Sequence, residues 1–122
     1  MARILIAEDE SSVRTLLARA FTQDGHAVES APDGAAALER LSKAEPFDLL
    51  LTDIQMPMMD GVALALAAKR DHPKLTIVLM TGYTDQRERA QSVKSLIHDI
   101  VQKPFTVAEI RTAVQSALAV RV

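Results

Sequence analysis

Five side chains that carry acidic, hydroxyl or ammonium groups stand where apolar stretches of the sequence end. They are Glu8 and Asp9 after residues 3–7, Asp53 after residues 47–52, Thr81 at the end of residues 75–81, and Lys103 at the end of residues 97–103. Three carboxylates brought together would repel one another and resist ionisation unless a cation lay among them. Oxygen-only ligands with room for water favour Mg²⁺ over a transition metal. If the fold gathers these groups, they predict a magnesium site.

Asp53 is the member of this set whose surroundings predict reactivity. It follows a run of apolar or β-prone residues, precedes a methionine-rich loop, and has no basic residue beside it in the sequence. With Mg²⁺ bound, a carboxylate in such a place can attack a phosphoryl group and form an acyl phosphate. Lys103 would supply positive charge to the phosphoryl oxygens, and Thr81 would donate a hydrogen bond to them.

The elements that must position these groups alternate along the chain. Apolar runs predict buried strands at residues 3–7, 47–52 and 75–81, with weaker strands at 26–31 and 97–103. Helices are predicted at residues 11–25, 34–44, 61–71 and 86–96, and after Thr106. The predicted N-cap residues are Ser11 or Ser12, Asp33, Asp60, Asp85 with Glu88, and Thr106 with Glu109. Asp60 and Gly61 are thus assigned to a helix start and not to chemistry.

Alternation of strand and helix predicts an α/β fold with an open, doubly wound parallel sheet. Parallel strands need crossovers of this length, and helices on both faces explain why the central strands are apolar throughout. Five repeats are too few for an eight-stranded barrel. In an open sheet of this class, ligands bind beside the carboxyl ends of the strands. The five side chains are therefore expected along one edge of the sheet.

Composition restricts the kinds of function that the chain can have. The chain has 122 residues with 48% hydrophobic and 25% charged residues, no cysteine, and a formal net charge of −2. This length suits one globular domain, and the charge does not favour binding to nucleic acid. The absence of cysteine excludes disulfides and thiol chemistry and is compatible with the cytoplasm. No apolar run approaches the roughly 20 residues of a membrane span.

The chain resembles the receiver domain of two-component response regulators. The pairs Glu8-Asp9, Thr81-Gly82 and Lys103-Pro104, together with Asp53 and the "MPMMDG" segment, occur in the same order and on the expected elements. The resemblance implies that residues 1–122 form a single receiver domain. It also implies a CheY-like, flavodoxin-like (βα)5 fold with strand order 2-1-3-4-5.

Site roles follow from this resemblance. It implies that Asp53 accepts a phosphoryl group from a sensor histidine kinase or a histidine phosphotransfer protein. Mg²⁺ would be bound directly by Asp9, Asp53 and the backbone carbonyl of Gln55, with Glu8 contributing through water. Thr81 would be the switch hydroxyl and Lys103 the phosphoryl-contacting base, in a cis peptide with Pro104. Self-phosphorylation from a phosphodonor and autodephosphorylation would be the only chemistry, so no other enzymatic activity is expected.

Four segments resemble a narrower group, the stand-alone CpdR-type regulators of alphaproteobacteria. They are "MARILIAEDE", "LALAAKRDHP", "LMTGYTDQRERA" and "IHDIVQKPF". This resemblance implies a cytoplasmic adaptor that, when unphosphorylated, primes the ClpXP protease through the ClpX unfoldase. The alternatives are a phosphorelay intermediate, a chemotaxis-type regulator, or a receiver fragment of a larger regulator.

One position departs from the receiver pattern. Many receivers carry an aromatic residue three positions before the lysine, where this chain has Ile100. Because a β-branched side chain is stiff at χ1, Ile100 is a poor switching element. We therefore predict that Tyr83 and the loop after Thr81 carry the change on phosphorylation.

Three other functions fit the sequence less well than that of a phosphorylated receiver. A phosphatase of the haloacid-dehalogenase kind needs a second aspartate two residues after the nucleophile, where this chain has Gln55. A flavin or nucleotide binder needs a hydroxyl- or glycine-rich loop after the first strand, where this chain has "AEDESS". A receiver that only binds partners is disfavoured because every reactive group is retained, and a phosphodonor assay would decide.

Overall fold

Five parallel strands form one sheet in the computed structural model, which describes residues 1–43, 45–82 and 84–119. The strands are β1 (Arg3–Ala7), β2 (Ala27–Ala31), β3 (Leu49–Asp53), β4 (Thr76–Thr81) and β5 (Asp99–Gln102). Their order across the sheet is β2-β1-β3-β4-β5, and every neighbouring pair is parallel. The predicted fold class and strand order are therefore confirmed.

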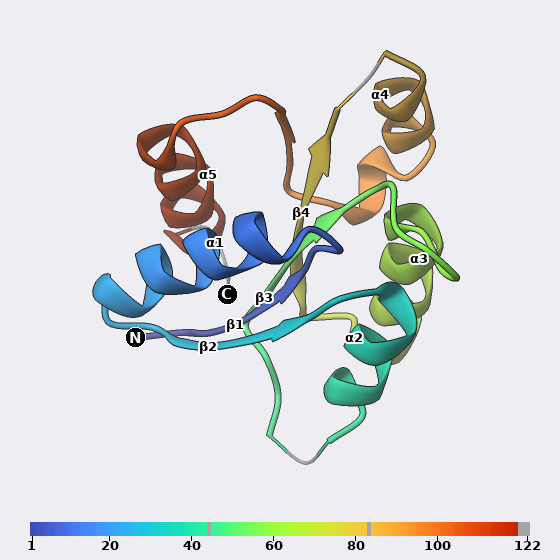
Figure 1. Cartoon of the computed structure of the whole chain (residues 1–122). Helices are drawn as coiled ribbons and strands as arrows, with labels where there is room; N and C mark the ends of the chain where they lie inside the picture. Colours follow the sequence, from blue (N-terminus) through green and yellow to red (C-terminus); the bar gives the residue numbers. More distant parts are fainter. Residues whose placement is uncertain (44, 83, 120–122) are drawn as a thin grey trace.

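Helices cover both faces of the sheet (Figure 1). They are α1 (Ser11–Gln23), α2 (Gly34–Leu41), α3 (Gly61–Asp71), α4 (Thr84–Gln91) and α5 (Val107–Ala119), and a short 3₁₀ turn, η1 (Lys94–Leu96), follows α4. Helices α1 and α5 pack on one face, while α2, α3 and α4 lie on the other. None of the described helices is long and apolar enough to cross a membrane.

Alternate residues of the central strands pack into two separate hydrophobic cores, one on each face of the sheet. On β1, Ile4 and Ile6 pack toward α1 and α5, whereas Leu5 packs toward α2 and α3. On β3, Leu50 and Leu51 divide between the same two faces and are both fully buried. A strand buried on both faces has no polar side, which explains why these segments read as continuous apolar runs.

Three of the predicted helix starts are confirmed by side-chain hydrogen bonds. The Asp33 carboxylate accepts from the Ala36 N–H at 2.8 Å. The Asp60 carboxylate accepts from the Ala63 N–H at 2.9 Å. Before α5, Thr106 and Glu109 form the reciprocal capping box, with bonds of 2.9 and 3.1 Å. Each bond satisfies a backbone donor that the helix itself leaves free.

The predicted N-cap of α1 and both predicted ends of α4 are wrong. Neither Ser11 nor Ser12 caps α1, because both lie within the helix and Glu10 is its N-cap residue. Helix α4 begins at Thr84, so it includes Asp85 instead of being capped by it, and it ends at Gln91 instead of continuing to residue 96. The Ser92 hydroxyl donates to the Arg89 carbonyl, and a hydroxyl that competes for the backbone in this way favours a helix end.

Gly61 allows α3 to begin directly against the end of β3. Its N–H donates to the Ile54 carbonyl at 2.8 Å, and a Cβ at this position would overlap the backbone carbonyl of Asp53. Any larger residue would therefore push the backbone of Asp53 away from its place.

We predict that Gly61→Ala destabilises the fold by about 3 kcal/mol or more, because backbone atoms and not a flexible side chain oppose the new methyl group. Gly25→Ala is the control, since Gly25 has a φ of 91° but open space around it. That change should cost only about 1 to 2 kcal/mol from backbone strain. Urea unfolding measures both values, and equal costs would show that the close contact at Gly61 is unimportant.

Candidate functional site

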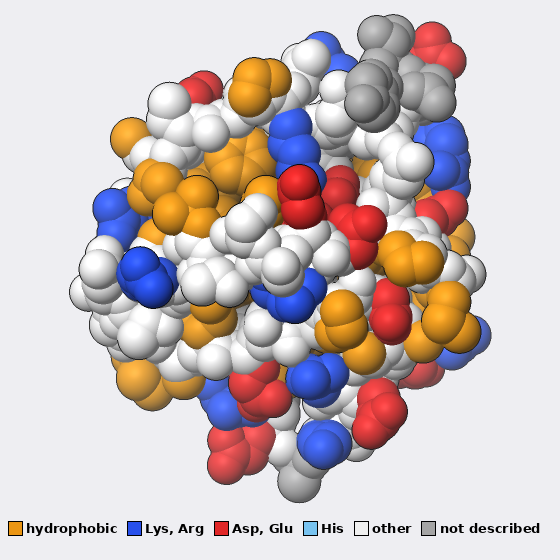
Figure 2. Space-filling model, viewed as in Figure 1, with side chains coloured by type: hydrophobic (Ala, Val, Ile, Leu, Met, Phe, Trp, Pro, Cys, Tyr) orange, Lys and Arg blue, Asp and Glu red, His pale blue; other side chains and the backbone are white. Residues whose placement is uncertain are grey.

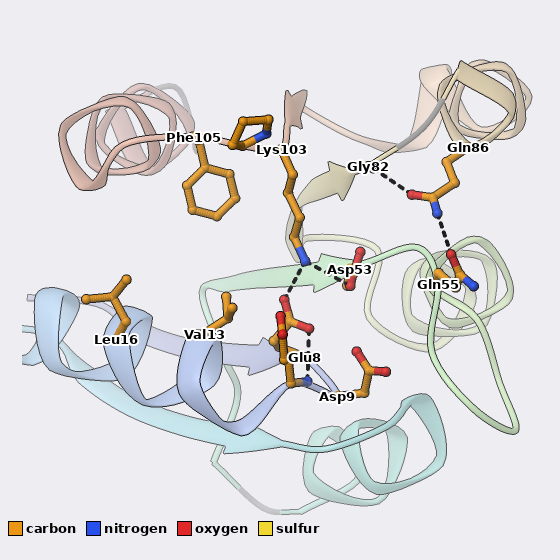
Figure 3. A pocket seen from close by; sticks show the side chains of 12 residues that line it. Glu8, Asp9, Val13, Leu16, Asp53, Gln55, Gly82, Gln86, Lys103 and Phe105 are labelled. Atoms are coloured by element: carbon orange, nitrogen blue, oxygen red, sulfur yellow. Dashed lines mark hydrogen bonds and ion pairs between the residues drawn. The ribbon is translucent and has the colours of Figure 1, made fainter.

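A pocket at the carboxyl ends of the strands contains most of the predicted site residues (Figure 3). It is lined by Glu8, Asp9, Glu10, Val13, Leu16, Asp53, Gln55, Gly82, Gln86, Lys103, Pro104 and Phe105. On the surface, acidic side chains gather beside basic ones near the middle of this view, with apolar side chains nearby over α1 and α5 (Figure 2). Groups from four strand ends therefore share one hollow.

The three predicted acids converge. One ligand oxygen from each of Glu8, Asp9 and Asp53 lies within 4.8 Å of the others. The register of the sheet explains this, since Ala7 of β1 pairs with Thr52 of β3 and each strand then delivers an acid at its next residue. Glu8 and Asp53 are buried, whereas Asp9 is exposed.

Lys103 places its ammonium group between two of these acids. Its Nζ lies 2.7 Å from Glu8 Oε1 and 3.0 Å from Asp53 Oδ2. The backbone N–H of Lys103 donates to the backbone carbonyl of Thr81. The peptide bond from Lys103 to Pro104 is cis, as the receiver resemblance implies. Burial would lower the pKa of Lys103, but its hydrogen bonds with Glu8 and Asp53 and their charges outweigh it and raise that pKa above its ordinary value. The amine is therefore held in its charged form.

Asp9 experiences the excess of negative charge. Although its side chain reaches solvent, its pKa is raised, first by partial loss of hydration, then by a hydrogen bond with Glu8 and by the charge of Glu8. A backbone hydrogen bond and the charge of Lys103 offset this only in part. Three carboxylates thus face one ammonium group, and a divalent cation would relieve the remaining repulsion. The donor set consists of oxygens, one of them on an exposed side chain, so it fits Mg²⁺ with room for water.

Thr81, the predicted switch residue, ends β4 with an unsatisfied hydroxyl. The side chain is fully buried, and its Oγ1 has no hydrogen-bond partner among the described residues. Buried hydroxyls are normally hydrogen-bonded. The chain thus keeps a free donor next to Gly82, which lines the pocket.

Gln55 and Gln86 form a bridge that the sequence did not reveal. Gln86 Nε2 donates to Gln55 Oε1 at 2.7 Å, and the Gly82 N–H donates to Gln86 Oε1 at 2.6 Å. The predicted role of the Gln55 backbone carbonyl as a metal ligand stays a prediction. The predicted helix at residues 86–96 already placed Gln86 in a first turn beside the strand ends, but no sequence signal paired it with Gln55.

The apolar wall of the pocket was also missed. Val13 and Leu16 from α1 face Phe105 from the segment before α5, and Leu16 remains 49% exposed (Figure 3). Val13 also packs against the core beneath α1 and α5, so the apolar face of α1 continues from the core into the pocket. Ile100 is partly buried and packs against the core beneath α2, α3 and α4. The prediction for Tyr83 lies outside the described residues.

Comparison with known proteins identifies the class. The family model for the response regulator receiver domain matches residues 4–115, so the chain belongs to this family. The response regulator receiver protein CpdR of Brucella abortus (strain 2308) is 38% identical over 118 residues, which are 97% of this chain and 98% of that protein.

Larger regulators also contain a matching segment. The DNA-binding transcriptional regulator NtrC of Escherichia coli (strain K12) is 34% identical over 116 residues, which are 95% of this chain but only 24% of NtrC. Among solved structures, response regulator protein TrrA of Thermotoga maritima, in complex with Mg(2+)-BeF, has a TM-score of 0.86 and 29% identity. That match covers 97% of this chain and 100% of the TrrA chain.

The convergence of the acids yields a prediction on stability. Asp9→Asn should raise the melting temperature of the metal-free protein at neutral pH, because it removes one of three repelling carboxylates. Asp9 holds its proton more tightly in the folded chain than at its ordinary pKa of 3.8. The stability linked to this group is therefore complete below pH 3.8 and is lost as pH rises through the higher folded-state pKa. The gain from the substitution should thus shrink on acidification.

The measurement is the melting temperature of both proteins in buffer that contains a metal chelator, from neutral pH down to pH 3.8. Glu39→Gln, which removes an exposed acid of α2, is the control and should change the melting temperature little. A neutral-pH melting temperature that falls in Asp9→Asn would count against three converging carboxylates.

Proposed function

We propose that this chain is a phosphoacceptor response regulator that is phosphorylated on Asp53. The phosphodonor is a sensor histidine kinase or a histidine phosphotransfer protein in the cytoplasm, and the phosphorylated chain signals through altered contacts with other proteins. The observation that carries this proposal is the position of the Lys103 ammonium group between Glu8 and Asp53, two of three converging carboxylates.

Transfer of the phosphoryl group follows from this geometry. An Asp53 carboxylate oxygen attacks phosphorus, the new O–P bond forms as the P–N bond to the donor histidine breaks, and the imidazole nitrogen keeps the electron pair of the broken bond. Lys103 already contacts Asp53 Oδ2 and can neutralise the arriving phosphoryl oxygens. Asp9 and Asp53, with Glu8 nearby, would hold Mg²⁺, and the bound cation would supply the further positive charge that a phosphoryl group needs to approach these acids.

Thr81 gives the site a way to respond. Its buried hydroxyl, which lacks a partner among the described residues, can donate to a phosphoryl oxygen that the unphosphorylated chain does not offer. Hydrolysis of the acyl phosphate by water restores Asp53 and releases inorganic phosphate. In this proposal the chain gains and loses its own phosphoryl group and acts on no other substrate.

The output we propose is control of ClpXP-dependent proteolysis as a CpdR-type adaptor. Two observations support this choice, namely the four segments that resemble that group and an alignment that spans 98% of Brucella CpdR. The alternative is a receiver within a larger regulator. It is supported by NtrC and by the sensor histidine kinase TmoS of Ectopseudomonas mendocina, of which the chain covers 24% and 12%.

Phosphorylation of Asp53 is tested directly with a small phosphodonor and Mg²⁺. We expect one phosphate, lost in base, on the intact protein by mass spectrometry, and none on Asp53→Asn. Asp99→Asn, which changes an exposed acid of β5, should take up phosphate like wild type. Equal phosphorylation of Asp53→Asn and wild type would disprove the assignment.

The adaptor role is tested by titration with purified ClpX. The unphosphorylated chain should bind ClpX about tenfold or more tightly than the chain saturated with beryllofluoride and Mg²⁺, a coupling within the usual range for switch proteins. Asp53→Asn should bind equally in both conditions because it lacks the acceptor carboxylate. Equal affinity of the wild type in both conditions would exclude a phosphorylation-controlled adaptor and would leave Asp53 phosphorylation itself untouched.

A further inference from the structure

Gln86 is a buried polar side chain that the proposed phosphorylation chemistry does not use. It lies in the first turn of α4, is only 6% exposed, and belongs to the lining of the same pocket as Asp53. Its two hydrogen bonds connect the segment after β4, through Gly82, with the segment after β3, through Gln55 (Figure 3).

The hydrogen-bond chemistry fixes the orientation of this bridge. A backbone N–H can only donate, so the atom of Gln86 that faces Gly82 must be the carboxamide oxygen. The amide nitrogen then faces Gln55, which must accept through its own oxygen. The Gly82 N–H is therefore occupied by an acceptor from within the chain.

This occupied donor directly follows the switch residue. Gly82 comes after Thr81, lines the pocket, and has no side chain to cover its amide group. Backbone N–H groups are among the donors that stabilise phosphoryl oxygens. A phosphoryl group on Asp53 would thus meet one free donor, the Thr81 hydroxyl, and one occupied donor beside it.

Helix α4 is held in place largely by polar contacts. Its sequence, TDQRERAQ, has one apolar residue, Ala90, which is fully buried. Three residues after Gln86, Arg89 forms an ion pair with Asp60, the cap of α3. Residues three apart on a helix share a face, so one side of α4 is tied to both ends of the segment between β3 and α3. Because little apolar area anchors α4, the loss of one polar contact can shift it.

We propose that Gln86 is a stand-in acceptor that couples Asp53 to α4. In the unphosphorylated chain its carboxamide oxygen takes the place of a phosphoryl oxygen at the Gly82 N–H and keeps α4 against Gln55. On phosphorylation the phosphoryl oxygen takes over this N–H, Gln86 is displaced, and the first turn of α4 is released. The inference rests on the proposed function and names a positioning residue for it.

Loss of the stand-in should therefore favour the phosphorylated form. Gln86→Met keeps the length of the side chain but provides no comparable acceptor, so Gly82 has an unsatisfied N–H until beryllofluoride binds. We expect Gln86→Met to bind beryllofluoride with Mg²⁺ about tenfold more tightly than wild type, the effect of one hydrogen-bond acceptor that need not be displaced. Gln86→Ala should also raise the affinity for beryllofluoride. This second variant shows that the gain comes from the loss of the glutamine and not from the added methionine.

Arg89→Met is the matched control for a general loosening of α4. It removes the ion pair of the helix with Asp60 and leaves the Gly82 N–H bonded to Gln86. Its beryllofluoride affinity should stay within about twofold of wild type. An affinity gain in Arg89→Met equal to that in Gln86→Met, or no gain in either variant of Gln86, would overturn the inference.

The Gly82 amide resonance gives a readout that does not depend on phosphorylation. The chain has four glycines, so their amide signals are few and assignable in a nitrogen-15 correlation spectrum. Without ligand, the Gly82 amide should exchange slowly with solvent in wild type and Arg89→Met, and faster in Gln86→Met. Equal exchange in all three would disprove the bond to Gln86 and leave the proposed function standing. Failure of wild type to bind beryllofluoride would remove the proposed function and this inference together.

Discussion

Electrostatic repulsion among the carboxylates at the ends of β1 and β3 is the constraint on which the rest of the structure depends. Two of these acids are buried, and a single ammonium group, that of Lys103, contacts them. Burying like charges together is unfavourable unless other interactions compensate. These acids lie where a cation and a phosphoryl group can bind. The site therefore carries an excess of negative charge that a bound cation would balance.

The surrounding elements hold the acidic side chains in place and allow a change of charge at the site to move a neighbouring helix. The sheet register fixes Glu8 beside Asp53, and α3 begins at Gly61 in close contact with the backbone of Asp53. The opposite side of the pocket is built differently, since α4 is held through the hydrogen bonds of Gln86 and the ion pair of Arg89. A rigid acidic centre thus adjoins a helix with few apolar anchors, an arrangement in which a new charge at the centre can move the helix.

Much of this arrangement was predictable because it depends on strand ends. Parallel strands deliver their last residues to one edge, so apolar runs that end in Glu8, Asp53 and Thr81 predicted a shared site. The link between Gln55 and Gln86 was not predictable in the same way. It depends on where α4 begins, and no residue pattern marks this start, since the predicted cap Asp85 lies inside the helix. A contact between a loop residue and the first turn of a helix has no sequence period, whereas contacts set by a sheet do.

The most direct test of the account is the melting temperature of wild type as Mg²⁺ is added, compared with Asp9→Asn. A cation that binds only the folded chain stabilises it by about 2.7 kcal/mol at one hundred times its dissociation constant. The account predicts a melting temperature that climbs with Mg²⁺ concentration in wild type and climbs much less in Asp9→Asn. A wild-type melting temperature that does not respond to Mg²⁺, or an equal response in the two proteins, would contradict a cation site formed by these acids.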